Sequence, residues 1–199
     1  ITALMHMVGV IYFCMFVVMC IIYGGGLTLA RLNPLPFFKK MLEAQVVAFS
    51  TTSSAATLPV NMKVAEKQLG VSKGISSFVL PLGASVNMDG LSAYMGVIAI
   101  FTASLYGIDL SIKKMLTVVL TSTVAAMGCA GVPAAGLIVL PMVLSSVGLP
   151  LDVIGLIAAV NRIIDMMSTT MNITGDAFSS VIIAKSEGEL DIKKYHETK

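Results

Sequence analysis

The chain has 199 residues, of which 56% are hydrophobic and 12% are charged, and its formal net charge is +2. Soluble globular domains carry about twice this share of charged residues, so the composition excludes that class and predicts a multi-pass protein of the cell (inner) membrane. The small net charge and the lack of basic residues interleaved with aromatic ones exclude nucleic acid as a partner.

Residues 1–32 are predicted to form a transmembrane helix that ends after the glycines at 24–26. Residues 33–70 are apolar in both halves but are interrupted by STTSSAATLP at 50–59. Each half is too short to cross a bilayer, because a spanning helix needs about 20 residues. Such a break is tolerated at membrane depth only where it is buried in protein or lines a cavity, so we expect a re-entrant hairpin here.

The second half of the chain repeats this arrangement. Residues 71–110 read as a transmembrane helix broken at NMDG, and residues 111–149 as a second re-entrant hairpin interrupted by AAMGCAGVP. Residues 150–186 are expected to form a polar-faced transmembrane helix, and residues 187–199 a cytoplasmic tail. Two interrupted segments in matching positions are typical of the binding site in an inverted-repeat transporter. The alternative is that each break is a kink in an ordinary helix. The predicted fold class is all-α throughout.

The distribution of basic residues gives the predicted orientation. With two re-entrant hairpins, Lys113 and Lys114 lie on one side of the membrane, and the other basic residues at the loops and the tail lie on the opposite side. The positive-inside rule makes that second side, including the C-terminus, cytoplasmic.

The ionisable residues at predicted membrane depth need an explanation. An aspartate or arginine at the centre of a spanning helix costs about 2.5–3.5 kcal/mol on insertion scales. One interpretation is an internal ion pair between Arg162 and Asp165, which leaves Asp89 and Asp176 unexplained. Two carboxylates beside carbonyl oxygens freed by a helix break predict an oxygen-ligand site for a hard cation. One helix face carries residues spaced i, i+3, i+7, i+10 and i+14, namely Arg162, Asp165, Thr169, Asn172 and Asp176.

Four motifs carry a resemblance to a known family: SSAATLPV at 53–60, LPLGASVNMDG at 80–90, GCAGVPAAG at 128–136 and DMMSTTMNITGD at 165–176. In this order and spacing they are similar to the dicarboxylate/amino acid:cation symporters, the family of the glutamate and neutral amino acid transporters. The resemblance covers residues 5–186 and only the C-terminal half of the family, the mobile transport domain. We therefore expect a piece of a longer protein that transports an amino acid together with sodium across the lipid membrane. We also expect that this protein forms a homotrimer through scaffold helices outside this chain.

The resemblance also implies roles for individual residues. The α-amino group of the substrate would bind Asp165 and carbonyls near Thr52 and Val132, and its α-carboxylate would bind Ser54 and Asn172, with Ser168 and Thr169 beside them. The tip of the second hairpin would be the gate, with Gly128, Gly131 and Pro133 allowing it to move. Three sodium sites are implied, formed by Asp89 with the carbonyl of Asn87, by Asp176 with the carbonyls of Gly83, Asn87 and Asn172, and by the carbonyls of Ser85, Ala126, Met127 and Cys129.

Departures from the acidic pattern of the family predict a neutral amino acid as substrate. Ser168 stands where acidic amino acid transporters carry an arginine, Asn161 where an aspartate supports that arginine, and Leu91 where a threonine follows NMDG. A buried carboxylate loses its charge-assisted bonds without that guanidinium. The alternative is an acidic amino acid or dicarboxylate symporter that uses Arg162 instead. An ion channel is a further alternative, since channels also place carboxylates and carbonyls at membrane depth. The sequence has no Ser/His or HExxH arrangement, so we expect neither catalytic residues nor a cofactor apart from sodium.

Overall fold

The computed structural model describes residues 2–129 and 131–197, and within these ranges the secondary structure is helical apart from one isolated bridge between Val71 and Leu190. The gate prediction at 128–133 includes residue 130, and the tail prediction includes residues 198–199, all of which lie outside the described ranges. The helices are α1 (Thr2–Val18), the π-helical turn η1 (Met19–Gly24), α2 (Gly25–Leu29), α3 (Pro34–Thr51), α4 (Ser54–Lys67), α5 (Lys73–Val86), α6 (Asp89–Leu105), α7 (Ile112–Met127), α8 (Ala135–Ser146), α9 (Val153–Ala158), α10 (Asn161–Ser186) and α11 (Ile192–His196).

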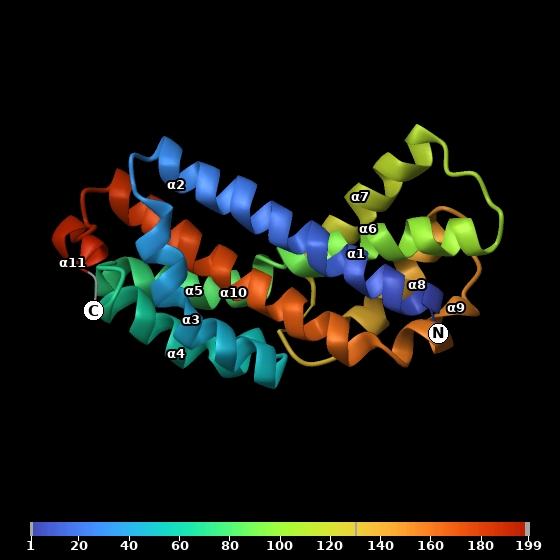
Figure 1. Cartoon of the computed structure of the whole chain (residues 1–199), viewed down its shortest axis with the longest axis horizontal. Coiled ribbons are helices and arrows are strands. Elements are labelled where there is room, and N and C mark those ends of the chain that lie inside the picture. The colour runs from blue at the N-terminus through green and yellow to red at the C-terminus, as the bar shows by residue number, and fades with distance from the viewer. Residues whose placement is uncertain (1, 130, 198–199) are drawn as a thin grey trace.

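The helices form an elongated body in which α10 runs along the long axis beside α1 (Figure 1). Helices α3, α4 and α5 surround one half of α10, together with α11 and the C-terminus. Helices α6, α7, α8 and α9 lie toward the other end, where the N-terminus also lies. Helices α3 and α4 pack as one helical hairpin, and α7 and α8 as another.

Two hydrophobic cores lie one after the other along α10. The first contains buried residues of α1, α6, α8 and α9, and α10 contributes Ile164 and Met171 to it. The second contains buried residues of α3, α4 and α5, and α10 contributes Ile173, Ala177 and Val181. The polar face of α10, from Arg162 to Asp176, lies along the region where the two cores meet. Its side chains are therefore beside the hairpin tips and the break between α5 and α6.

The break between α5 and α6 lies where the NMDG motif predicts it. Helix α5 ends at Val86 and α6 begins at Asp89, so Asn87 and Met88 are non-helical. Gly90 is required because α6 begins directly against α10: a Cβ atom at this position would lie 2.4 Å from the backbone oxygen of Ser168. The motif therefore brings main-chain atoms of α6 into contact with α10.

The breaks at the hairpin tips are shorter than the sequence predicts. The predicted interruption at 50–59 reduces to Thr52 and Ser53, because the side chain of Ser53 accepts a hydrogen bond from the N–H of Ala56 and starts α4. Pro59 lies inside α4 and does not end the break. In the second hairpin α7 ends at Met127 and α8 begins at Ala135, so the helix before the break continues to Met127, whereas the sequence predicts that the break begins at residue 125.

The expected single helix over 150–186 is also wrong in detail. Helix α9 ends at Ala158, and α10 begins at Asn161 after a non-helical Val160. The short α9 buries Val153 and Ile157 in the first core, and the chain then starts a new helix with a polar face. Asn161 and Arg162 consequently lie in the first turn of α10.

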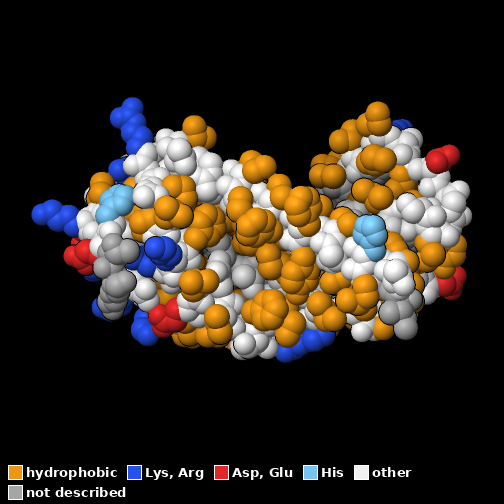
Figure 2. Space-filling view, viewed as in Figure 1, with side chains coloured by type: hydrophobic (Ala, Val, Ile, Leu, Met, Phe, Trp, Pro, Cys, Tyr) orange, Lys and Arg blue, Asp and Glu red, His pale blue; other side chains and the backbone are white. Residues whose placement is uncertain are grey.

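The surface has the pattern of a membrane protein. Among the described residues, Thr2–Leu29 and Lys73–Leu105 are the two helical segments long and apolar enough to cross a membrane. Hydrophobic side chains cover the middle of the molecule, whereas Lys and Arg side chains gather at the end that holds α11 (Figure 2). Re-entry of the two hairpins into a membrane stays a prediction.

Candidate functional site

A small cavity lies between the two hairpin tips, α6 and α10. All seven residues predicted to bind substrate line it, together with the predicted selectivity residue Leu91. Its volume of about 30 Å³ is room for one or two water molecules, since one water needs about 10–15 Å³ by this measure. An amino acid therefore fits only after part of the lining moves. The lining residues are Thr52, Ser54, Met88, Leu91, Gly131, Val132, Ala135, Gly136, Asp165, Ser168, Thr169 and Asn172.

The carboxylate of Asp165 connects α10 to the second hairpin. Its Oδ2 atom accepts hydrogen bonds from the backbone N–H of Ala134, at 2.8 Å, and from the side-chain amide of Asn161, at 2.9 Å. Asp165 is 7% exposed, so its charge lies almost entirely inside the protein. A buried carboxylate at the wall of a cavity is suited to bind an ammonium group.

Arg162 does not form the ion pair with Asp165 that the sequence allows. Its guanidinium donates hydrogen bonds to Thr52 Oγ1, at 2.6 Å, and to the carbonyl oxygen of Ser50, at 2.9 Å. Both acceptors belong to the first hairpin, and Thr52 lines the cavity. Arg162 and Asn161 are not lining residues themselves, but the positive charge of Arg162 lies one hydrogen bond from the cavity wall.

The two hairpin tips contact each other directly. The backbone oxygen of Gly131 accepts hydrogen bonds from Ser53 Oγ, at 2.7 Å, and from the N–H of Ala55, at 3.2 Å. Each tip also contains a non-glycine residue in the left-handed region, Thr52 at φ 52° and Ala134 at φ 62°. Such backbone costs about 1–3 kcal/mol and persists only where neighbouring contacts hold it, which is typical of functional segments.

Asn87 and Asp176 form the centre of the second predicted sodium site. The amide of Asn87 donates to Asp176 Oδ1, at 3.0 Å, and to the backbone oxygen of Asn172, at 3.1 Å. Gly83 packs against the same carboxylate, because a Cβ atom there would lie 2.5 Å from Asp176 Oδ1. All four residues predicted for this site are therefore neighbours.

Asp176 has an oxygen atom without a hydrogen-bond partner. The residue is 1% exposed, and its Oδ2 atom is buried and accepts no hydrogen bond from the described residues. A buried carboxylate oxygen left unpaired is costly, and a bound cation would offset that cost, as the sequence predicts for this site. The described residues contain no group of three or more His, Cys, Asp or Glu that could hold a metal ion. The Asp176 carboxylate and the backbone oxygen of Asn172, both bonded to Asn87, are hard oxygen ligands of the kind that suits a hard cation such as sodium.

The other two predicted sodium sites are less completely assembled. The carboxylate of Asp89 accepts a hydrogen bond from the hydroxyl of Tyr23, at 2.7 Å, on the π-helical turn. For the third site, Ala126 and Met127 end α7, Cys129 lies two residues beyond it, and Ser85 lies near the end of α5. Helices α5 and α7 are in contact, and Gly131 of the second tip also lies close to α5, since a Cβ atom there would lie 2.8 Å from Ala84 O.

Several contributors to the site were not predicted. Tyr23, Ser53 and Ala134 supply the hydrogen bonds described above, and the N–H of Gly90 donates to Asn172 Oδ1 at 2.7 Å. The glycine is visible in the NMDG motif and the serine in the STTSS run. Backbone donors such as Ala134 have no signature in side-chain chemistry, so no pattern in the sequence identifies them.

Comparison with known proteins identifies the group to which this arrangement belongs. Residues 1–186 match the family described as the sodium:dicarboxylate symporter family. The chain belongs to this family. Its members are secondary transporters and not enzymes, and membership implies a membrane protein, in agreement with the two long apolar segments.

Three relatives illustrate the similarity. Excitatory amino acid transporter 2 of Homo sapiens is 40% identical over 187 residues, which cover 90% of this chain and 33% of that protein. Excitatory amino acid transporter 3 of Mus musculus is 46% identical over 162 residues, which cover 81% of this chain and 31% of that protein. An excitatory amino acid transporter of Caenorhabditis elegans is 42% identical over 160 residues, which cover 80% of this chain and 32% of that protein. The chain thus spans about a third of the length of these relatives.

Proposed function

We propose that this chain forms the substrate- and sodium-binding part of a symporter for an amino acid that carries a second carboxylate. The observation that carries the proposal is the pair of opposite charges at one cavity: Asp165 in its wall and Arg162 hydrogen-bonded to Thr52 of the same wall. The dicarboxylate in the family description and the names of the relatives favour this substrate class over the neutral amino acid predicted from Ser168.

Each charged or polar group of the cavity then has a role. Asp165 binds the α-amino group, Ser54 and Asn172 bind the α-carboxylate, and Arg162 turns from Thr52 toward the side-chain carboxylate. The polar lining offers few other partners for such a charge, so the guanidinium is the group that offsets its burial. Ser168 and Thr169 complete the wall beside Asn172.

Sodium binding supports substrate binding through shared groups. Asn172 contributes its side chain to the cavity and its carbonyl oxygen to the Asp176 site, so an ion at Asp176 fixes a residue that also contacts substrate. Each ligand then raises the affinity for the other by the same factor. The further sodium positions, at Asp89 and at the end of α7, complete the coupling in this proposal.

Movement of the second hairpin admits the substrate. The cavity is too small for an amino acid while Gly131 is bonded to Ser53 and Ala55, so the segment from Gly128 to Pro133 has to open as the gate. In the membrane, both hairpins re-enter from opposite sides, the C-terminus is cytoplasmic, and the loaded domain crosses as a unit. Trimerisation is assigned to scaffold helices outside this chain, as in the resemblance described above.

A neutral amino acid is the second candidate substrate. Ser168 and Leu91 line the cavity, and neither carries a positive charge that could form an ion pair with a side-chain carboxylate. In this case Arg162 keeps its hydrogen bonds to the first hairpin and has a structural role.

The test is sodium-dependent binding by the full-length protein that contains this segment, measured by calorimetry with aspartate, glutamate, serine and alanine. The proposal predicts that aspartate or glutamate binds only with sodium. Arg162→Gln is expected to weaken that binding about 10- to 100-fold, because it removes charge-assisted hydrogen bonds worth about 1.5–3 kcal/mol.

Ser168→Arg provides the complementary control. This variant places a guanidinium in the cavity wall and is expected to restore acidic binding in the Arg162→Gln background. Binding of serine or alanine with sodium, without binding of either acidic amino acid, would replace the acidic substrate by the neutral one. Binding that ignores sodium would overturn the symport proposal itself.

A further inference from the structure

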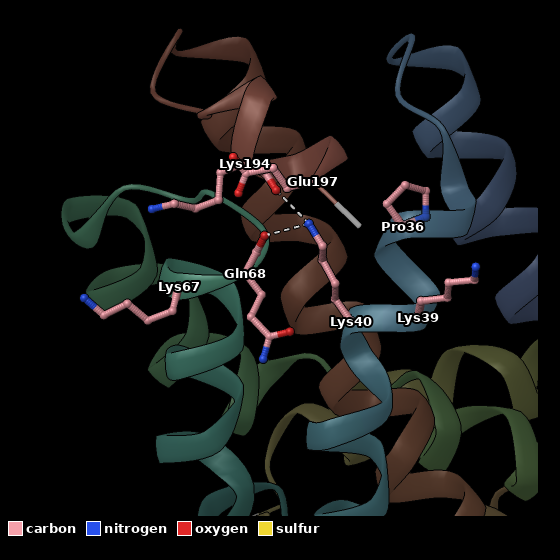
Figure 3. A pocket seen from close by; sticks show the side chains of 7 residues that line it. All are labelled: Pro36, Lys39, Lys40, Lys67, Gln68, Lys194 and Glu197. Atoms are coloured by element: carbon pink, nitrogen blue, oxygen red, sulfur yellow. Dashed lines mark hydrogen bonds between the residues drawn. The ribbon is translucent and has the colours of Figure 1, made fainter. Parts of the chain in front are cut away.

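A second cavity lies at the end of the molecule that holds the C-terminus, far from the substrate cavity along α10 (Figure 1). Its volume is about 170 Å³, several times that of the substrate cavity. Four lysines and one glutamate contribute to its lining, and they come from the start of α3, the end of α4 and the C-terminal tail (Figure 3). The lining residues are Pro36, Lys39, Lys40, Lys67, Gln68, Lys194 and Glu197.

The wall contributed by the tail is fixed in place. Tyr195 is fully buried, and its hydroxyl donates a hydrogen bond to the backbone oxygen of Asn33 at 2.9 Å. The backbone N–H of Asp191 donates to the oxygen of Gly70 at 2.8 Å. The tail is therefore packed against both the start of α3 and the connection between α4 and α5. The cavity is a built feature of the fold and not a gap beside a loose terminus.

Lys40 points inward, and its ammonium group donates three hydrogen bonds to the protein. Its ammonium donates to the backbone oxygens of Gln68, Lys194 and Tyr195 at 3.0, 2.7 and 2.8 Å. These bonds join α3 to α4 and to the tail, which are the three walls of the cavity. Partial burial lowers the pKa of Lys40.

The other three lysines have no such partners. Within the described residues, the ammonium groups of Lys39, Lys67 and Lys194 form neither hydrogen bonds nor ion pairs. By contrast, Lys63 of α4 pairs with Glu43 at 2.9 Å. Lys67 and Lys194 extend on the same side of the cavity and Lys39 on the other (Figure 3). Glu197 is the one carboxylate among the described lining residues, so positive charge remains in excess there, and an added anion would offset the repulsion among the lysines.

The surface next to the cavity indicates which kind of anion could bind there. Leu35, Leu42 and Val46 are exposed on α3 at 66, 58 and 64%, and with Lys39 they share one helix face at spacings of four, three and four residues. Such a stripe, apolar along its length and basic at its end, is typical of a helix at the boundary between lipid tails and headgroups. In a helix with this pattern the lysine lies at the level of the lipid phosphates.

We propose that this lysine-lined cavity binds the phosphate group of an anionic phospholipid. Lys67 and Lys194, which extend to the same side, contact the phosphate, and Lys39 adds positive charge on the side where the apolar stripe of α3 contacts the acyl chains. The site is separate from the cavity that binds substrate, and its occupation would hold α3, α4 and the tail together at the membrane surface.

The experiment compares two triple variants of the full-length protein in lipid nanodiscs. One carries Lys39→Gln, Lys67→Gln and Lys194→Gln, and the other carries Lys63→Gln, Lys113→Gln and Lys114→Gln, which removes the same charge elsewhere. Nanodiscs contain either phosphatidylcholine alone or an equimolar mixture with phosphatidylglycerol. Native mass spectrometry counts the phosphatidylglycerol molecules that stay bound. The first variant is expected to retain several-fold less phosphatidylglycerol than the second.

Equal retention by the two variants would overturn the proposal. Inorganic phosphate is added to the phosphatidylcholine nanodiscs in a separate arm. The melting temperature of the unaltered protein is measured in both kinds of nanodisc. If inorganic phosphate raises it as much as phosphatidylglycerol does, the occupant is a soluble phosphate and the lipid assignment is wrong. A cooperative thermal unfolding transition confirms that each variant is folded. If the first triple variant does not fold, Lys67→Gln and Lys194→Gln are measured singly in the same way.

Discussion

Asp176 illustrates how one buried atom points to an ion. Its Oδ1 atom bonds to Asn87, whereas Oδ2 has no partner among the described residues. Asp176→Asn is expected to weaken sodium binding and substrate binding together, each by about tenfold or more, because the amide lacks the charge that a cation needs. The melting temperature of the full-length protein, measured while sodium is titrated with substrate present and while substrate is titrated with sodium present, gives both affinities.

The control for this variant is Asp109→Asn, which removes an exposed carboxylate from the loop between α6 and α7. It is expected to leave both affinities unchanged. Unaltered sodium dependence in Asp176→Asn would contradict the role given to this residue.

Side chains of the candidate site could be predicted from the sequence, but many of their partners could not. Helical spacing placed Asp165, Asn172 and Asp176 on one face of α10, and the structure has them on one helix beside the break in NMDG. Spacing alone could not decide whether Arg162 faces Asp165 or the first hairpin, because both lie within reach of a long side chain. The choice depends on where α3 ends, which is a tertiary contact.

At the scale of elements, the second hairpin depends on a close approach between α8 and α6. A Cβ atom at Gly136 would lie 1.4 Å from the hydroxyl oxygen of the buried Tyr94. Gly136→Ala is therefore expected to lower the free energy of unfolding by about 1–3 kcal/mol, the usual cost of overpacking, and to weaken substrate binding by displacing the start of α8 from the cavity.

Gly155→Ala is the matched control, since a Cβ atom at this position in α9 meets nothing within 4 Å. Alanine is favoured over glycine in a helix, so this variant is expected to be neutral or slightly stabilising. Denaturant-induced unfolding compares the two variants. Equal stability of both would mean that Tyr94 moves aside at little cost, contrary to the expectation.

The elements themselves were predicted better than their ends. Apolar length and Gly/Pro-containing interruptions indicated the number and order of the long segments, because these features act locally. The sequence overestimated the breaks, since Ser53 both belongs to a polar run and caps α4. Pro59, Pro81 and Pro141 lie inside helices, so proline alone does not mark a boundary here.

At the scale of the whole molecule, the C-terminal tail is part of the packed structure and not a free extension. Tyr195→Ala removes a fully buried aromatic ring and is expected to lower the free energy of unfolding by roughly 3–5 kcal/mol. Tyr106→Ala, at an exposed tyrosine near the end of α6, is the control. Unfolding of the full-length protein in detergent measures the difference. Equal stability of the two variants would show that the tail contributes little to the fold.

The first turns of α10 hold the two hairpin tips by bonds of opposite polarity. Arg162 donates to the first tip, at Ser50 and Thr52, whereas Asp165 accepts from the second tip, at Ala134. An arriving ammonium group competes with the Ala134 N–H for Asp165 and gains nothing from the donor Arg162. An amino group can therefore replace only the bond to the second tip, and the bond to the first tip is replaced only by a substrate that also carries an anion for Arg162.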